Sequence, residues 1–244
     1  MATQIKTRPR PYTSAVGQAR PRSLFASSIG TKILIAVTGL LLFVYLVLHL
    51  AGNLLVYLGP ATFNGYSHLL IKNPLIVPIE IGLAAIFVLH VYKAIMNWVA
   101  NRRARPVGYY RRKWGGPPSR KSIASSTMIF SGLVILVFVA IHLAQFKYGP
   151  EYLVAEAAPG GELRDLYRLE MEVFGNVLNV AFYGFCMVVV GFHLWHGFSS
   201  AFQSLGADHP RYTPLVLRTG KVVALALAGG FLSIPLWAYL LGSR

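Results

Sequence analysis

Four of the seven histidines lie singly in four long apolar stretches of the chain: His49, His90, His142 and His193. An ionisable side chain inside an apolar span indicates a functional site. Histidines that face one another across a helix bundle can bind haem iron from both sides. Four such histidines could therefore hold two haems, although a lone histidine in a span can also simply hydrogen-bond a neighbouring helix.

The composition indicates an integral membrane protein. Of the 244 residues, 55% are hydrophobic and 13% are charged, and the mean hydropathy is +0.54. A soluble domain of this size would be less apolar. The net charge of +15 does not indicate nucleic-acid binding, because the basic residues border the spans and do not form a separate module. We expect an all-α integral membrane protein with five transmembrane helices, four of which form a haem-binding bundle.

Windows of about 20 residues, the length that crosses the hydrocarbon core, define the spans. They predict five spans over residues 33–58, 75–99, 123–147, 172–199 and 221–241. Glycine and proline residues between the spans indicate turns and loops. Residues 1–32 are expected to form a basic cytoplasmic tail, and residues 33–244 a single five-helix di-haem domain. No convincing internal repeat is visible.

Charge distribution predicts the orientation, because lysine and arginine near span ends stay on the cytoplasmic side. Residues 1–32 contain six basic residues and no acidic one, and residues 102–121 contain eight basic residues. The loop 148–171 holds five of the eight acidic residues. We therefore expect a multi-pass protein of the bacterial inner (cytoplasmic) membrane, with the N-terminus cytoplasmic.

Depth in the membrane sorts the four histidines into pairs. At about 1.5 Å per residue, His90 and His193 lie about 10 to 14 Å from the cytoplasmic ends of their spans. On the same basis His49 and His142 lie about 24 to 28 Å from those ends. The prediction is an inner pair, His90 with His193, and an outer pair, His49 with His142. Span five has no histidine and is expected to pack outside the four-helix bundle.

Three further residues are candidates for secondary roles. His196 could replace His193 as a ligand, or could donate a hydrogen bond to a haem propionate or a quinone. Glu80 is a candidate for proton exchange near a quinone, with a surface carboxylate as the alternative. Lys93 could pair with a propionate of the inner haem, or could extend its side chain to the cytoplasmic interface.

The sequence lacks the signals of other redox groups. There is no C-x-x-C-H motif, so any haem would be bound non-covalently as haem b. The single cysteine, Cys186, cannot hold an iron–sulfur cluster. There is no G-x-G-x-x-G nucleotide fingerprint. We therefore predict no catalytic residue in this chain and no enzymatic activity of the chain on its own.

Several short motifs, in their order along the chain, carry a family resemblance. They are Ser27-Ser28-x-Gly30-x-Lys32, His49-Leu50-x-Gly52-Asn53-Leu54, Phe63-Asn64-x-Tyr66, His142-Leu143, the run from Phe192 to Phe198, and Ser200-Ala201-Phe202-Gln203. Over residues 25–218 the chain resembles the cytochrome b subunit of succinate dehydrogenase and fumarate reductase. The form it resembles is the five-helix, di-haem, cytochrome b558-type membrane anchor of complex II.

The resemblance implies an electron-transfer subunit of succinate:quinone oxidoreductase, a complex of the respiratory chain and the tricarboxylic acid cycle. Its partners would be a flavoprotein subunit and an iron–sulfur subunit on the cytoplasmic face, together with membrane lipid and a quinone, for which we expect menaquinone. The family's four axial ligands of haem iron fall on His49, His90, His142 and His193. Two alternatives remain open at this point: a di-haem anchor of another oxidoreductase, and a haem-free transporter that uses the histidines as a proton relay.

Overall fold

The computed structural model describes residues 27–105, 107, 122–155 and 162–242. The secondary-structure elements in chain order are α1 (Ser28–Asn53), η2 (Leu54–Leu58), α2 (Pro60–Lys72), α3 (Ile76–Arg103), α4 (Ile123–Ser126), α5 (Met128–His142), η3 (Leu143–Lys147), β1 (Leu153–Ala155), β2 (Glu162–Arg164), α6 (Leu166–Phe174), α7 (Val177–Ser204) and α8 (Thr213–Leu241). The basic tail before residue 27 and most of the basic loop 102–121 lie outside the described residues.

Among the described residues, five helical segments are long and apolar enough to cross a membrane, as predicted. They are Ser28–Leu58, Ile76–Arg103, Met128–Lys147, Val177–Ser204 and Thr213–Leu241. The two strands form one short antiparallel hairpin between the third and fourth of these segments. The all-α membrane fold with five spanning helices is therefore confirmed.

Two helices begin at other residues than the predicted spans, because a capping side chain fixes the first turn of each. Ser27 accepts a hydrogen bond from the backbone nitrogen of Gly30 at 2.9 Å, so α1 begins at Ser28 and includes residues assigned to the tail. Asn176 accepts one from the backbone nitrogen of Leu178 at 2.8 Å, so the fourth span begins at Val177. A window of average hydropathy cannot detect such caps.

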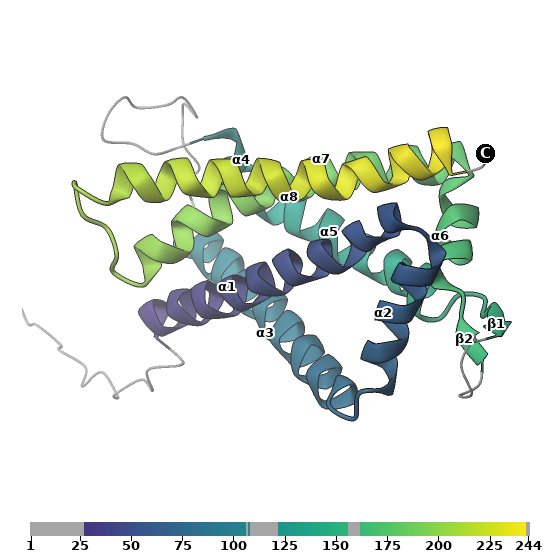
Figure 1. The fold of residues 1–244 in the computed structure, drawn as a ribbon. Coiled ribbons are helices and arrows are strands. Elements are labelled where there is room, and N and C mark those ends of the chain that lie inside the picture. Colours follow the sequence, from purple (N-terminus) through teal and green to yellow (C-terminus); the bar gives the residue numbers. More distant parts are fainter. Residues whose placement is uncertain (1–26, 106, 108–121, 156–161, 243–244) are drawn as a thin grey trace, which may run out of the picture.

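The helices pack around α1 and α7 (Figure 1). Helix α7 lies along α8 and also contacts α1 and α5, whereas α3 packs mainly on α1. Along α3, which the structure describes from end to end, no residue is fully buried. Helix α8 packs chiefly on α7, with further contacts to α1 and α6.

Two helices, α2 and α6, form where the sequence indicated loops, and they close the end of the bundle near the outer histidines (Figure 1). Pro60 lies in the first turn of α2, where its missing N–H costs nothing. Helix α6 is strongly amphipathic, with Leu169, Glu170 and Phe174 buried. Asp165 caps it by accepting a hydrogen bond from the backbone nitrogen of Arg168 at 3.0 Å.

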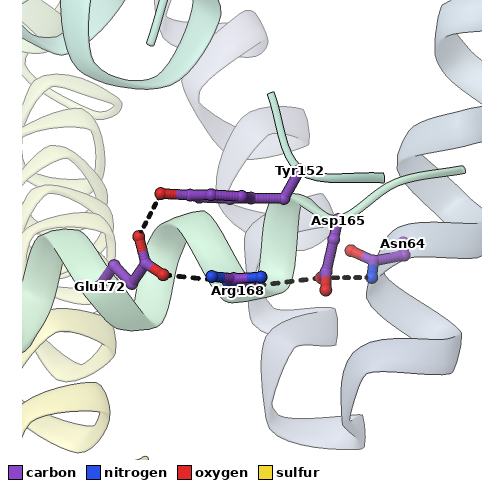
Figure 2. Close-up of polar contacts among 5 residues, drawn as sticks. All are labelled: Asn64, Tyr152, Asp165, Arg168 and Glu172. Carbon is purple, nitrogen blue, oxygen red and sulfur yellow. Dashed lines mark hydrogen bonds and ion pairs between the residues drawn. The ribbon is translucent and has the colours of Figure 1, made fainter. Parts of the chain in front are cut away.

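Buried Asn64 joins α2 to α6 (Figure 2). Its Nδ2 donates to Oδ1 of Asp165 at 2.8 Å, and its Oδ1 accepts from the backbone nitrogen of Tyr167 at 2.9 Å. Figure 2 also shows Glu172 between Arg168 and Tyr152, each of which donates a hydrogen bond to it. The hydrogen bonds from Tyr152 and Arg168 lower the pKa of Glu172. Asn64, a residue of the Phe63-Asn64-x-Tyr66 motif, therefore has a structural role at this end.

We expect Asn64→Ala to lower the free energy of unfolding by about 1 to 3 kcal/mol, because the backbone nitrogen of Tyr167 and the Asp165 carboxylate each lose a partner. Thermal unfolding of the protein in lipid nanodiscs measures the change. Asn73→Ala is the matched control, since Asn73 is exposed and bonds only a neighbouring backbone nitrogen, that of Leu75. An equal effect of the two substitutions would contradict this role of Asn64.

Candidate functional site

The outer pair of histidines meets between α1 and α5. The imidazole rings of His49 and His142 have centroids 5.9 Å apart and are nearly perpendicular, at 88°. His142 is the last residue of α5, and a short π-helical segment, η3, continues the span after it. The structure thus brings together the two residues that depth alone had paired.

Aromatic side chains surround this outer pair. Tyr45 stacks on His49 at 5.3 Å between ring centroids, and Phe138 stacks on His142 at 5.6 Å. In each case the aromatic residue precedes the histidine by one helical turn. Phe231 of α8 lies 5.7 Å from the His49 ring. Helix α8 therefore contributes a side chain to the outer site, which the absence of histidine in that span did not predict.

Polar contacts also reach the outer rings. The Tyr183 hydroxyl donates to Oε1 of Gln145 at 2.7 Å and lies 3.5 Å from Nδ1 of His142. The side-chain amide of Asn53 donates to the backbone carbonyl of His49 at 2.7 Å and lies 3.4 Å from its Nδ1. The contacts to the two imidazole nitrogens are long, so they orient these rings weakly.

The inner histidines each face a hydroxyl group on a neighbouring helix. Nδ1 of His90 on α3 lies 3.0 Å from Oγ1 of Thr38 on α1. Nδ1 of His193 on α7 lies 2.9 Å from Oγ of Ser131 on α5. His90 and His193 are also near enough to interact electrostatically. These two hydroxyl partners were not identified from the sequence.

A glycine lies beside each inner ring. A Cβ atom at Gly39 would come within 3.1 Å of Cε1 of His90, and one at Gly132 within 3.5 Å of Cε1 of His193. The missing side chain at Gly39 therefore lets the His90 ring lie close to the backbone of the next helix, whereas a Cβ atom at Gly132 would make only an ordinary van der Waals contact with the His193 ring. Gly52 instead makes room for the Tyr66 ring, because a Cβ atom there would come within 2.7 Å of that ring. That contact joins two of the motifs that carry the family resemblance.

The site reveals an internal repeat that the sequence analysis missed. Thr38–Leu50 on α1 aligns without a gap with Ser131–Leu143 on α5 and η3, with five identical positions. Both segments contain a hydroxyl residue, then glycine, an aromatic residue one turn before the histidine, and His-Leu at the end. Apolar helices align easily by chance. The repeat is established by the matching contacts of the hydroxyls, glycines and aromatic rings.

The spacing within the repeat explains how one helix serves both levels. In each segment the hydroxyl residue precedes the histidine of the same segment by 11 residues: Thr38 precedes His49, and Ser131 precedes His142. Eleven residues make about three helical turns and a rise of about 16 Å, so the two side chains share one helix face at different depths. Helices α1 and α5 therefore each carry an outer histidine and an inner hydroxyl.

The secondary candidates take different positions. His196 is three residues beyond His193 on α7, is half-buried and interacts electrostatically with His193. Lys93 holds the equivalent position after His90 on α3, and both follow an aromatic residue, Tyr92 or Trp195. Glu80, near the start of α3, forms an ion pair with Lys147 of η3 and is 44% exposed.

The arrangement fits haem b held by two imidazoles at each level. The two histidines of each pair come from different helices, and a neutral imidazole is a common ligand of iron. The inner rings form their hydrogen bonds through Nδ1, which leaves Nε2 available for a ligand. Two axial imidazoles would leave no iron position for oxygen or substrate. No protein-family model, curated protein or solved structure matches this chain.

Proposed function

We propose that this chain is the membrane-anchor cytochrome b subunit of a succinate:quinone oxidoreductase, with two b-type haems. The observation that carries the proposal is the presence of two histidine pairs at two depths of one helical bundle. In the outer pair the rings of His49 and His142 meet directly, and in the inner pair His90 and His193 are each held by a hydroxyl. The motif resemblance supports the choice of this oxidoreductase among di-haem anchors.

The four histidines would bind the haem irons and leave them coordinatively saturated. The haems would supply one-electron transfer from the cytoplasmic side of the membrane toward the quinone. The chain's own residues orient the imidazoles and exclude water through the aromatic side chains around the outer pair. Haems held in this way would supply electron transfer only, and the dicarboxylate chemistry would belong to the partner subunits.

Proton exchange at the quinone would need ionisable groups near the outer level. Glu80 and Lys147 form an ion pair there, joining α3 to η3. Glu80 is also near enough to Tyr45 to interact electrostatically, and Tyr45 stacks on the His49 ring. The ion pair and the interaction with Tyr45 support Glu80 as the candidate for proton exchange on this side of the bundle.

The inner end of the bundle is basic, which suits docking of the iron–sulfur and flavoprotein subunits. Arg102 and Arg103 end α3, and Lys221 lies near the start of α8. The Arg102 guanidinium lies 5.1 Å from the Trp98 ring, and the Lys221 ammonium 5.3 Å from the Trp195 ring. Such cation–π contacts hold charge at the membrane boundary. With the basic end cytoplasmic, the protein would lie in a bacterial inner membrane.

A reduced-minus-oxidised visible spectrum of the purified protein, with pyridine haemochrome quantification against protein, tests the proposal. We expect two b-type haems per chain. Folded protein, expressed with haem available, that remains colourless would overturn the proposal and favour a transporter. Co-purification of a flavoprotein and an iron–sulfur protein distinguishes a succinate:quinone oxidoreductase from a hydrogenase or formate dehydrogenase anchor.

A further inference from the structure

We infer that Thr38 and Ser131 are positioning residues that fix the tautomer of His90 and His193, so that both inner histidines present an unprotonated Nε2 to one shared haem iron. The inference rests on the proposed function for the identity of the ligand at Nε2. The tautomers are argued from the hydrogen bonds of the two hydroxyl groups, and at His90 the backbone carbonyl of Ile35 is a second acceptor that favours the same tautomer.

The hydroxyl proton of Thr38 is already used within its own helix. Oγ1 of Thr38 lies 2.6 Å from the backbone carbonyl oxygen of Leu34. Two oxygen atoms approach this closely only when a proton lies between them, so Thr38 donates to that carbonyl. A hydroxyl has one proton and two lone pairs. At the 3.0 Å contact with His90, Thr38 must therefore accept, and Nδ1 of His90 must carry the proton.

At Ser131, in the second half of the repeat, the distance is an ordinary hydrogen-bond length, and the assignment rests on the fact that a backbone carbonyl can only accept. Oγ of Ser131 lies 2.9 Å from the carbonyl oxygen of Met128, to which it donates. At the 2.9 Å contact with His193 the oxygen is the acceptor, and Nδ1 of His193 is the donor. In neutral imidazole one nitrogen carries the proton and the other is free. His193 is thus left with a free Nε2, as His90 is.

Each of the two hydroxyl residues is followed by a glycine that lies beside the imidazole ring. Gly39 leaves room for the His90 ring beside the helix that bears the hydroxyl, and the His193 ring lies beside Gly132 at a distance that does not itself require glycine. The two inner rings are therefore oriented in the same way by the two halves of the repeat. The outer rings have contacts of 3.4 and 3.5 Å at Nδ1, and these do not fix a tautomer as firmly.

The first test does not depend on haem. Histidine-¹⁵N NMR of the haem-free protein in lipid bilayers reports which ring nitrogen is protonated, and His90→Gln and His193→Gln identify the two signals. We expect the Nδ1–H form for both residues in the parent protein. Thr38→Val should shift His90, and Ser131→Ala should shift His193, toward the Nε2–H form. Thr38→Ser should restore the parent signal of His90.

A second test uses the haem-loaded protein. A hydrogen-bond partner behind a ligating imidazole raises its basicity, and loss of such a partner typically weakens binding about 10- to 100-fold. We expect the Thr38→Val, Ser131→Ala double variant to bind the inner haem 10- to 100-fold more weakly and to raise its midpoint potential. The outer haem is the internal reference. Ser199→Ala is the matched control, because Ser199 on α7 donates only to backbone carbonyls of its own helix.

The outcomes separate this inference from the proposed function. An Nε2–H tautomer of His90 or His193 in the parent protein, or an unchanged inner haem in the double variant, overturns the inference while two haems per chain still support the function. Nδ1–H tautomers in a protein that takes up no haem overturn the function and support the positioning role. Equal changes in Ser199→Ala and in the double variant would also count against the positioning role.

Discussion

We expect His193→Ala to lose one of the two b-type haems that we propose for this chain, whereas His196→Ala should retain both. His193 is held by Ser131 at 2.9 Å and lies against Gly132, as His90 is held by Thr38 and lies against Gly39. His196 lies one turn further along α7, outside this matched arrangement. Haem content by pyridine haemochrome, with the resolved α-band of each haem, measures the result. Half of the haem absorbance should remain in His193→Ala.

Substitution of a histidine of the outer pair should remove the haem that His193→Ala retains. His142→Ala should remove the other haem and leave the inner one, because its ring meets His49 and not the inner rings. His68→Ala is a control for the general loss of a histidine, since His68 lies on α2 and not in a spanning helix. Full haem content in His193→Ala would transfer the fourth ligand position to His196. Loss of the inner haem with retention of the outer one in His142→Ala would contradict the assignment of the pairs.

Glu170→Gln should stabilise the protein at pH 8.5 and have little effect at pH 5. Glu170 is 4% exposed on the buried face of α6, and burial raises its pKa to about 8. In the unfolded chain the pKa is about 4.3. Between these values the folded state binds a proton that the unfolded state does not, so the free energy of unfolding falls as pH rises. The full loss, reached above pH 8, is on the order of 5 kcal/mol.

Thermal unfolding in nanodiscs at pH 5, 7 and 8.5 checks this expectation. The parent protein should lose stability across the series, and Glu170→Gln should lose less because it cannot ionise. Glu172→Gln is the matched control on the same helix. Glu172 is exposed and is paired with Tyr152 and Arg168, which lower its pKa, so its substitution should not stabilise the protein at high pH. A parallel pH dependence of the parent and Glu170→Gln would contradict the assignment.

The sequence predicted the five spans and the depths of the four histidines because both depend on local properties: mean hydropathy and a constant helical rise. The contact between His49 and His142 agrees with those depths, although α1 and α5 themselves pack mainly on other helices and meet through these side chains. The predicted ends of the spans were less accurate, because they depend on single capping residues such as Asn176. Helices α2 and α6 were missed, since their turns carry proline and charge that resemble loop composition.

The partners of the histidines could not be predicted, because they come from other helices. Nothing local to His90 indicates that Thr38, 52 residues earlier, supplies its hydrogen bond. Phe231 reaches His49 only because α8 packs on α1 as well as on α7. The repeat, in contrast, was present in the sequence. An alignment of the segments before His49 and His142 would have shown the shared hydroxyl-glycine pair and pointed to both as parts of the site.

The repeat also means that the two depths are not mechanically independent. Helix α1 carries His49 and Thr38 about three turns apart on one face, and α5 carries His142 and Ser131 in the same way. Because a helix moves as a rigid rod over this length, a rotation of α1 about its axis turns an outer ring and an inner hydroxyl through the same angle. A displacement of His49 along the membrane normal likewise displaces the oxygen that holds His90 by the same distance.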